Sequence, residues 1–125
     1  MNVKLDTKEK FTVITPQEAD LPANMTAELS ELLLSWLEKD IPHVVLNMQM
    51  VQHIDESTGE TLAAIQQRFY EKHHSFVICE LQDAVEKLLD QKELLEVMNV
   101  TPTESEAWDI LQMEEVEREL LGGEE

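Results

Sequence analysis

Hydroxyl and carboxylate side chains, the groups most able to do chemistry in this sequence, gather in one short segment, residues 55–61. Ser57 and Glu60 have the spacing of a Ser-x-x-Glu capping box, in which the serine hydroxyl accepts a backbone N–H at the start of a helix. The segment therefore predicts a helix that begins at Ser57. Any chemical role for this hydroxyl has to be weighed against that structural one.

Other chemically active residue types are not arranged for catalysis or metal binding. No two of the four histidines have the i, i+4 spacing of a helical metal site, and the single cysteine, Cys79, does not join them. Adjacent acids such as Glu114 and Glu115 are expected to be solvated, and the sequence has no glycine-rich phosphate loop and no Gly-x-Ser-x-Gly turn. We expect no enzymatic activity, no metal and no cofactor.

The charge of the chain excludes further classes of partner. Nine Lys and Arg stand against 27 Asp and Glu, which gives a formal charge of −18 in 125 residues. Such a chain repels phosphate groups, so neither direct nucleic-acid binding nor docking on an anionic membrane is expected. No apolar run is long enough to insert into a bilayer. With its only cysteine in an apolar stretch and no secretory leader, the protein is expected to be cytoplasmic.

The hydrophobic pattern places these residues on a framework of alternating strands and helices. Hydrophobic residues make up 42% of the chain, which is enough for the core of one domain. Apolar and β-branched runs predict strands at 11–15, 19–21, 44–48, 75–80 and 97–100. Helical spacing predicts four helices, at 25–37, from 57 for about four turns, at 84–89 and from about 103. This alternation predicts an α/β domain, with 4–5 strands flanked by about four helices.

The ends of these elements carry their own signals. Asn24 is the expected N-cap of the first helix, and Thr101 and Thr103 each precede a glutamate by three residues, as in two overlapping capping boxes. The sequence changes in kind after Met113, because residues 114–125 hold six Glu and one Arg and include Gly122 and Gly123. We therefore divide the chain into a domain, 1–113, and an acidic C-terminal tail, 114–125.

The segment VVLNMQMVQHIDESTGETLAAI resembles the signature of the STAS domain, the family of bacterial anti-sigma-factor antagonists. Ile54 and Asp55 match the hydrophobic residue and the aspartate of the family motif Asp-Ser-Ser-Gly, Ser57 falls on its second serine, and Leu62 falls on the leucine of the following helix. The turn at Asp20 and Leu21 and the final segment MNVTPTESEAWDIL are similar to the corresponding family segments. The resemblance covers residues 8–113 and implies a mixed sheet in a single STAS-like domain.

What the resemblance implies is a protein-binding switch. In the family a partner anti-sigma kinase phosphorylates the second serine, so Ser57 is the candidate acceptor here and Thr58 is the alternative. A helix N-terminus tolerates added phosphate charge, because its dipole and its free N–H groups favour an anion. The expected partner is an anti-sigma factor or a related protein kinase. It would contact a surface made by Asp55, Glu56, Ser57, Thr58, Glu60 and Thr61.

Several positions depart from the family pattern. Glu56 replaces the first serine, Thr58 replaces the glycine, and Asn47 stands where an acid usually ends the strand. A phosphate on Ser57 would meet the carboxylates of Asp55, Glu56 and Glu60, which raises the cost of phosphorylation.

A second interpretation therefore stays open, a constitutive STAS subunit of a larger complex such as a lipid transporter, without phosphoregulation. A third interpretation, a domain that binds a small ligand, is weaker than these two, because the sequence has no glycine pattern that would bind the phosphates of a nucleotide. The oligomeric state also stays open, a weak homo-oligomer included.

Overall fold

Five strands form one mixed sheet in a computed structural model that describes residues 1–122. The strand order is β1-β2-β4-β6-β7; β1 and β2 are antiparallel, and every other neighbouring pair is parallel. A small second sheet pairs β3 with β5 in parallel. The strands are β1 (Val3–Thr7), β2 (Thr12–Pro16), β3 (Asp20–Leu21), β4 (Val44–Asn47), β5 (His53–Ile54), β6 (Phe76–Cys79) and β7 (Val100–Thr101).

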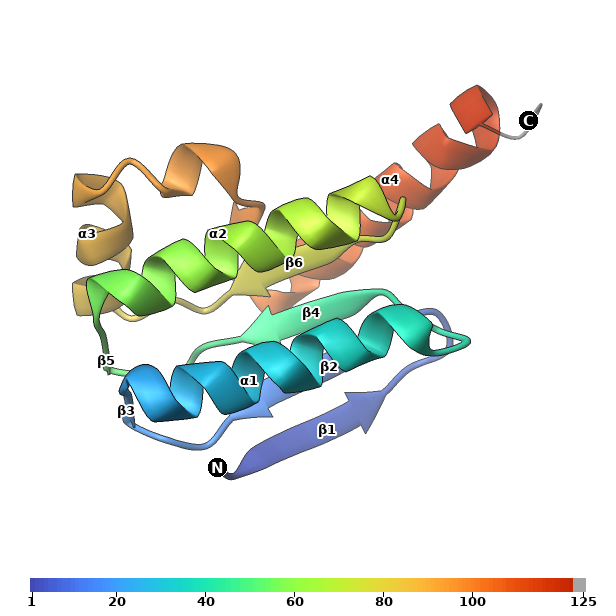
Figure 1. The fold of residues 1–125 in the computed structure, drawn as a ribbon. Helices are drawn as coiled ribbons and strands as arrows, with labels where there is room; N and C mark the ends of the chain where they lie inside the picture. The colour runs from blue at the N-terminus through green and yellow to red at the C-terminus, as the bar shows by residue number, and fades with distance from the viewer. Residues whose placement is uncertain (123–125) are drawn as a thin grey trace.

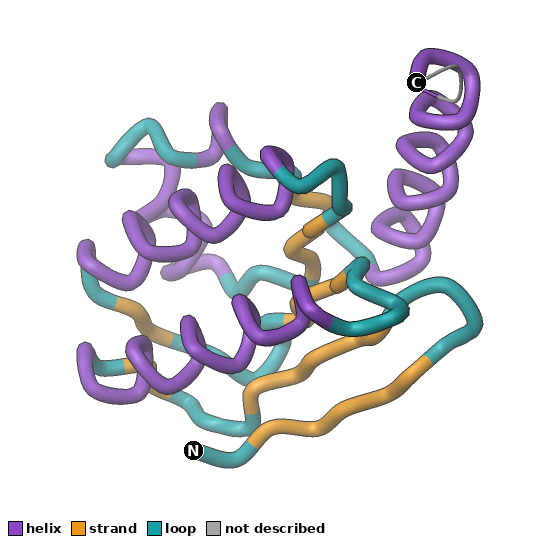
Figure 2. The backbone as a smooth tube through the Cα atoms, turned by 45° about the vertical axis from the view of Figure 1, so that its right-hand side comes forward, coloured by secondary structure: helices purple, strands orange, loops and turns teal. Residues whose placement is uncertain are grey.

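Helices cover both faces of the sheet (Figure 1). The α-helices are α1 (Ala23–Ser35), α2 (Glu56–Glu71), α3 (Asp83–Gln91) and α4 (Glu104–Gly122), with short 3-10 helices η1 (Trp36–Glu38) and η2 (Leu95–Val97). The helices α1 and α2 lie side by side on one face, and α4 crosses the other (Figures 1 and 2). In residues 1–122 no helix is both long enough and apolar enough to cross a membrane.

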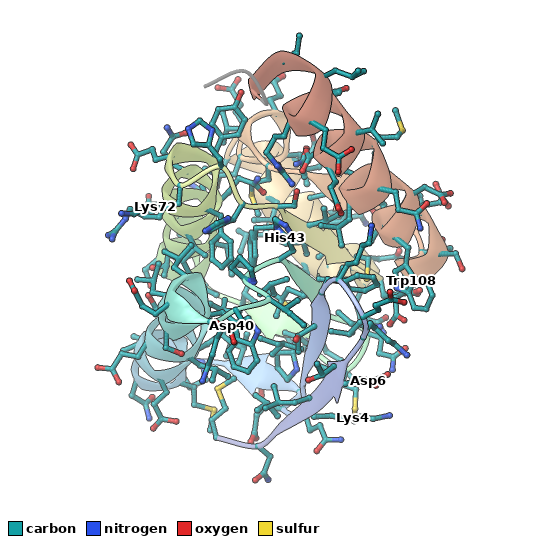
Figure 3. All side chains as sticks on the ribbon, turned by 90° about the vertical axis from the view of Figure 1, so that its right-hand side faces the viewer. Lys4, Asp6, Asp40, His43, Lys72 and Trp108 are labelled. Carbon is teal, nitrogen blue, oxygen red and sulfur yellow. The ribbon has the colours of Figure 1, made fainter. Side chains whose placement is uncertain are left out.

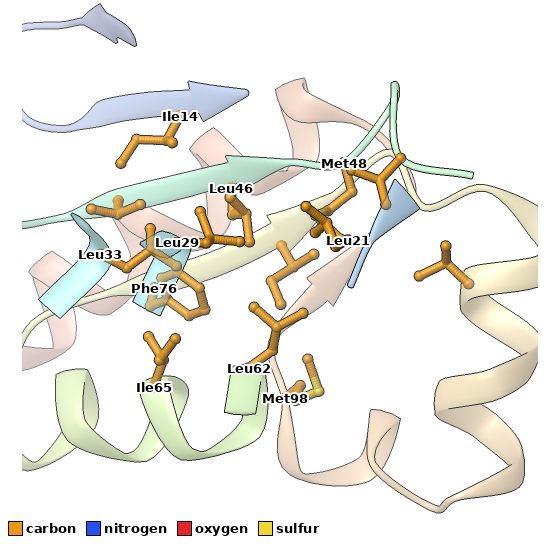
Figure 4. Packing of buried hydrophobic residues seen from close by; sticks show 14 of the residues in the cluster. Ile14, Leu21, Leu29, Leu33, Leu46, Met48, Leu62, Ile65, Phe76 and Met98 are labelled. Atoms are coloured by element: carbon orange, nitrogen blue, oxygen red, sulfur yellow. The ribbon is translucent and has the colours of Figure 1, made fainter. Parts of the chain in front are cut away.

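The alternation of side chains along β4 and β6 explains why helices are needed on both sides. Successive strand residues point to opposite faces, and every residue of these two strands is buried. Leu46, Phe76 and Ile78 face the core beneath α1 and α2, which Figure 4 shows from close by. Val45, Val77 and Cys79 belong to a second cluster, closed by Ala107 and Leu111 of α4. The predicted α/β class, with a mixed sheet of 4–5 strands and about four helices, is confirmed.

Differences from the predicted elements lie mainly at the ends of the chain and of the helices. The strand β1 was not predicted, because it is a mostly exposed edge strand without a buried apolar run. The strand expected at 97–100 is instead the end of η2 followed by the two-residue β7. Asn24 is not the N-cap of α1; Pro22 holds that position, and Asn24 lies inside the helix.

The start of α4 bears out one of the two predicted capping boxes in part. The Thr103 hydroxyl accepts the backbone N–H of Glu106 at 3.2 Å, as a cap does. The Thr101 hydroxyl instead donates to the Thr103 carbonyl, so the first box is not formed. At its other end α4 continues past Met113 to Gly122, so the domain boundary that we drew falls inside a helix; residues 123–125 of the predicted tail lie outside the described residues.

Candidate functional site

The segment with the candidate residues lies where the chain passes from β5 into α2. The pairing of β3 with β5 brings the turn before α1 next to the turn before α2, so two segments more than 30 residues apart meet. His53 Nδ1 and Asp20 Oδ1, one from each strand, lie 3.0 Å apart at the exposed edge of this pair. The site thus lies where the N-termini of α1 and α2 come together, at the carboxyl ends of the parallel strands.

Asp55, and not Ser57, is the N-cap of α2. Its Oδ1 accepts the Thr58 N–H at 2.9 Å and the Ser57 hydroxyl at 2.7 Å, and the Thr58 hydroxyl is also within reach at 2.8 Å. These donors, the Ser57 hydroxyl first, hold the pKa of Asp55 below its ordinary value, because they stabilise the ionised carboxylate. The predicted capping box from Ser57 to Glu60 is therefore wrong, and the helix begins one residue earlier, at Glu56.

Thr58 is buried, although we expected it on the contact surface. Its hydroxyl has Asp55 Oδ1 and the Leu21 carbonyl oxygen, at 3.1 Å, in reach as acceptors, but its one hydrogen goes to a single acceptor. The Thr26 hydroxyl lies 2.8 Å from the Thr58 hydroxyl and 3.1 Å from the Pro22 carbonyl oxygen, so either threonine can donate in the bond between them. This hydrogen-bond network joins α2 to α1 and β3. Thr58 thus has a structural role in the folded chain. Its burial contradicts our expectation that it is an alternative phosphate acceptor and part of the surface that contacts a partner.

Ser57 presents its hydroxyl at the surface, beside further exposed acids. Of the six residues expected to contact a partner, Asp55, Glu56, Ser57 and Glu60 are exposed and Thr61 is half-buried. The only hydrogen bond described for the Ser57 hydroxyl is the one that it donates to Asp55. Ser57 is therefore the one hydroxyl of the motif that is both accessible and not needed to cap the helix.

No sequence pattern predicted the partner of Glu56. Lys92, at the end of α3, places its Nζ 2.9 Å from Glu56 Oε1. The helix α3 and the following η2 come close to α2 because residue 59 is glycine: a Cβ there would lie 3.0 Å from methyl groups of Leu89 and Leu94. One of the three carboxylates around Ser57 is thus neutralised by a lysine that is distant in the sequence.

Asn47 has a structural role away from Ser57. It is buried at the end of β4, where its Oδ1 accepts the Gln49 N–H at 2.9 Å and its Nδ2 donates to Glu104 Oε1 at 3.1 Å. The backbone N–H of Glu104 in turn donates to Glu80 Oε2 at 2.9 Å. An acid at position 47 would oppose the Glu104 carboxylate, whereas the amide donates to it. The amide therefore fits this strand end, which it ties to the start of α4.

Within residues 1–122 no group of three or more His, Cys, Asp or Glu side chains is arranged to hold a metal ion. Cys79 is a free, buried cysteine. Burial raises the pKa of its thiol to about 12, so the reactive thiolate is scarcely populated at neutral pH.

Comparison with known proteins agrees with the fold. The sequence pattern of the STAS domain matches residues 2–107. By contrast, no curated protein matches the whole sequence significantly.

Solved structures similar to this chain include two small bacterial proteins and one domain of a transporter. An anti-sigma factor antagonist from Thermotoga maritima has a TM-score of 0.80 at 16% identity, over 88% of this chain and 94% of that protein. A STAS domain protein from Planctomyces limnophilus has a TM-score of 0.74 at 19% identity, over 88% and 97% of the two chains. A murine solute carrier 26 anion transporter matches over 83% of this chain but 18% of its own, with a TM-score of 0.69 at 14% identity.

Proposed function

This chain belongs to the STAS domain family, and from that membership we propose that it is a non-catalytic regulatory protein, switched by phosphorylation of Ser57. The unmodified surface made by Asp55, Glu56, Ser57, Glu60 and Thr61 binds an anti-sigma factor or a related protein kinase. The two small bacterial structures with this fold, one named as an anti-sigma factor antagonist and one as an anti-sigma-factor antagonist domain protein, support this class of partner. Its site of action is the cytoplasm, and no cofactor is part of the proposal.

The observation that carries the proposal is the contrast between two adjacent hydroxyls. Thr58 is buried and hydrogen-bonded to neighbouring elements, and Asp55 caps the helix. Ser57 is exposed and is needed for neither task. A kinase can reach its hydroxyl without unfolding the start of α2, and the N-terminus of a 16-residue helix favours an added anion.

Phosphorylation would change the contact between Ser57 and Asp55 from attraction to repulsion. The hydroxyl now donates to the carboxylate at 2.7 Å. A phosphoserine carries about two negative charges at neutral pH and has no hydroxyl hydrogen to donate, so the two groups would repel each other. The modified side chain would turn away from Asp55 into the surface that binds the partner, and an acidic or apolar partner would be released.

Lys92 moderates the cost of this added charge. A phosphate on Ser57 would be near Asp55, Glu56 and Glu60, but Glu56 is already paired with Lys92 at 2.9 Å. The lysine keeps the local field less negative than the sequence suggests. Phosphorylation is therefore compatible with the surrounding charges, provided that the pair with Lys92 persists.

The test compares two serines that lie in the first turns of helices. Ser57→Asp adds a negative charge at the exposed start of α2, and the matched control Ser105→Asp adds the same charge at an exposed position in the first turn of α4, on the other face of the sheet. Each variant is used to capture partners from lysate of the native host, with identification by mass spectrometry. Circular dichroism first checks that both variants retain the helix content of the wild type.

We expect the wild type and Ser105→Asp to capture the same anti-sigma factor or ATP-binding kinase, and Ser57→Asp to lose it. A phosphopeptide containing phosphorylated Ser57, isolated from the host, would complete the support. Equal recovery of one partner by all three forms would refute the switch. It would favour the alternative, a constitutive STAS subunit of a larger complex, for which the similar fold of the domain in the anion transporter is a precedent.

A further inference from the structure

The C-terminal part of α4 carries large apolar side chains that lie outside the two core clusters and stay mostly exposed. Leu111 is the last of its residues in the core, at 5% exposed. Beyond it Met113, Val116, Leu120 and Leu121 are 58, 52, 70 and 80% exposed. Figure 1 shows this end of α4 extending past the end of α2, away from the body of the domain.

Two residues fix the rotation of this part of the helix. The Ser75 hydroxyl, just before β6, donates to Glu114 Oε1 at 2.6 Å, and Arg118 Nη2 donates to the same hydroxyl at 2.9 Å. Glu114 and Arg118, one turn apart, therefore face the domain. Met113, Val116 and Leu120, at i, i+3 and i+7, form a stripe on another side of the helix, and we call it the α4 stripe.

The α4 stripe lies far from Ser57. Figure 3 looks onto the end of the domain from which α4 extends, with His43 between α2 and α4. His43 and Ser75 directly precede the parallel strands β4 and β6, whereas Ser57 follows the carboxyl ends of the strands. A partner on the stripe would thus not occupy the surface around Ser57.

The charges beside the stripe indicate what kind of partner it fits. Glu115, Glu117 and Glu119 lie in the same helix segment; Glu115 is paired with Lys10 at 3.2 Å, and the last turn has no basic residue. Carboxylates near a helix C-terminus face the negative end of the helix dipole, so they destabilise the helix that they belong to. A cationic partner would relieve both this interaction and the repulsion among the glutamates.

We propose that the α4 stripe is a docking face for an amphipathic helix of a partner protein, with leucine-type residues on one side and lysine or arginine beside them. An apolar stripe at i, i+3 and i+7 matches the ridges of another helix, and the flanking glutamates match its basic residues. A second copy of this chain fits less well, because two such helices would bring glutamates against glutamates. Phosphate-rich partners are repelled by the net charge of −18.

The test uses three labelled synthetic peptides and the full-length chain at physiological salt. One peptide is a lysine–leucine amphipathic helix of about 18 residues. The second has the same composition in a scrambled order that destroys the apolar stripe, and the third replaces lysine with glutamate. Binding is measured by fluorescence anisotropy, and backbone amide NMR shifts locate the contact. The double variant Val116→Ser/Leu120→Ser removes the stripe, and Val97→Ser, 60% exposed in η2, is the matched control.

We expect the amphipathic basic peptide to bind at least about tenfold more tightly than either other peptide, with shifts confined to residues 113–121. The double variant should lose that preference, and Val97→Ser should keep it. All these residues are exposed, so the variants should fold. Equal binding of the scrambled peptide, unchanged binding by the double variant, or shifts elsewhere would overturn the proposal. So would a dimer of the wild-type chain in sedimentation that the double variant lacks, because the stripe would then be covered by a second copy.

Discussion

The contrast between Ser57 and Thr58 predicts opposite results from two conservative substitutions. Thr58→Val keeps the shape of the side chain but removes its hydroxyl from a buried site. Ser57→Ala removes an exposed hydroxyl whose one described hydrogen bond goes to Asp55. The first change should destabilise the fold, and the second should not.

The structure sets the size of each effect. Without the Thr58 hydroxyl, Thr26 loses a partner at 2.8 Å and Asp55 loses a hydroxyl within reach. The Leu21 carbonyl keeps only the Thr26 hydroxyl, at 3.4 Å, as a side-chain donor. Loss of one hydrogen bond together with a poorly satisfied buried group costs about 2 kcal/mol. For Ser57→Ala we expect a change below about 0.5 kcal/mol, because the site is solvated and Asp55 still caps the helix.

Equilibrium unfolding in urea measures both values. A loss of about 2 kcal/mol raises the unfolding equilibrium constant about 30-fold. It also lowers the Tm by about 8 °C for a chain of this length. The double variant Thr26→Val/Thr58→Val should cost less than the sum of the two single changes, because both hydroxyls belong to one network. Equal stability losses for Ser57→Ala and Thr58→Val, or additive losses in the double variant, would refute the reasoning.

Three further predictions concern other parts of the fold. His73 and Glu93 directly follow the C-cap residues of α2 and α3 and have φ of 61° and 59°, a conformation that glycine adopts without strain. His73→Gly and Glu93→Gly should therefore each stabilise the protein by about 0.5–1 kcal/mol in the same urea assay. Destabilisation by both variants would contradict this account of the helix ends. Burial lowers the pKa of His43 below 6.5, so the unfolded chain takes up the proton first and stability falls as the pH drops below about 6.5. His43→Asn should flatten that decline, measured as the urea midpoint against pH, and an unchanged slope would show that other groups cause it. Cys79 should react with a thiol reagent only after denaturant is added, and rapid labelling of the native protein would contradict its burial.

Local patterns were sufficient for most of the framework. The run from Val44 to Leu46 is apolar at each position, and only a strand covered on both faces needs such a run. The spacing of Leu62, Ile65 and Phe69 predicted one buried face of a helix, and all three are buried in α2. Such patterns repeat within a few residues, so neighbouring positions alone reveal them. They also gave the segment that identified the family.

The same patterns failed at chain and helix ends, where several residue types compete for one position. Asp55, Ser57 and Asn24 are all good N-cap residues, and the sequence does not say which of them is used. In the structure Asp55 caps α2 because its carboxylate accepts the Thr58 N–H and lies beside two hydroxyl donors, whereas Asn24 lies inside α1 behind Pro22. The edge strand β1 escaped prediction for a related reason, since an exposed strand has no buried face to mark it.

The sequence by itself determined the class of fold, the net charge of −18, and the segment around Ser57 as the candidate site. Only the tertiary structure decided which hydroxyl in that segment is free. Thr58 points inward because Thr26, 32 residues earlier, lies against it, and Glu56 is paired because α3 brings Lys92 beside it. Local sequence sets backbone preference and periodicity, but burial and charge pairing depend on segments that only folding brings together.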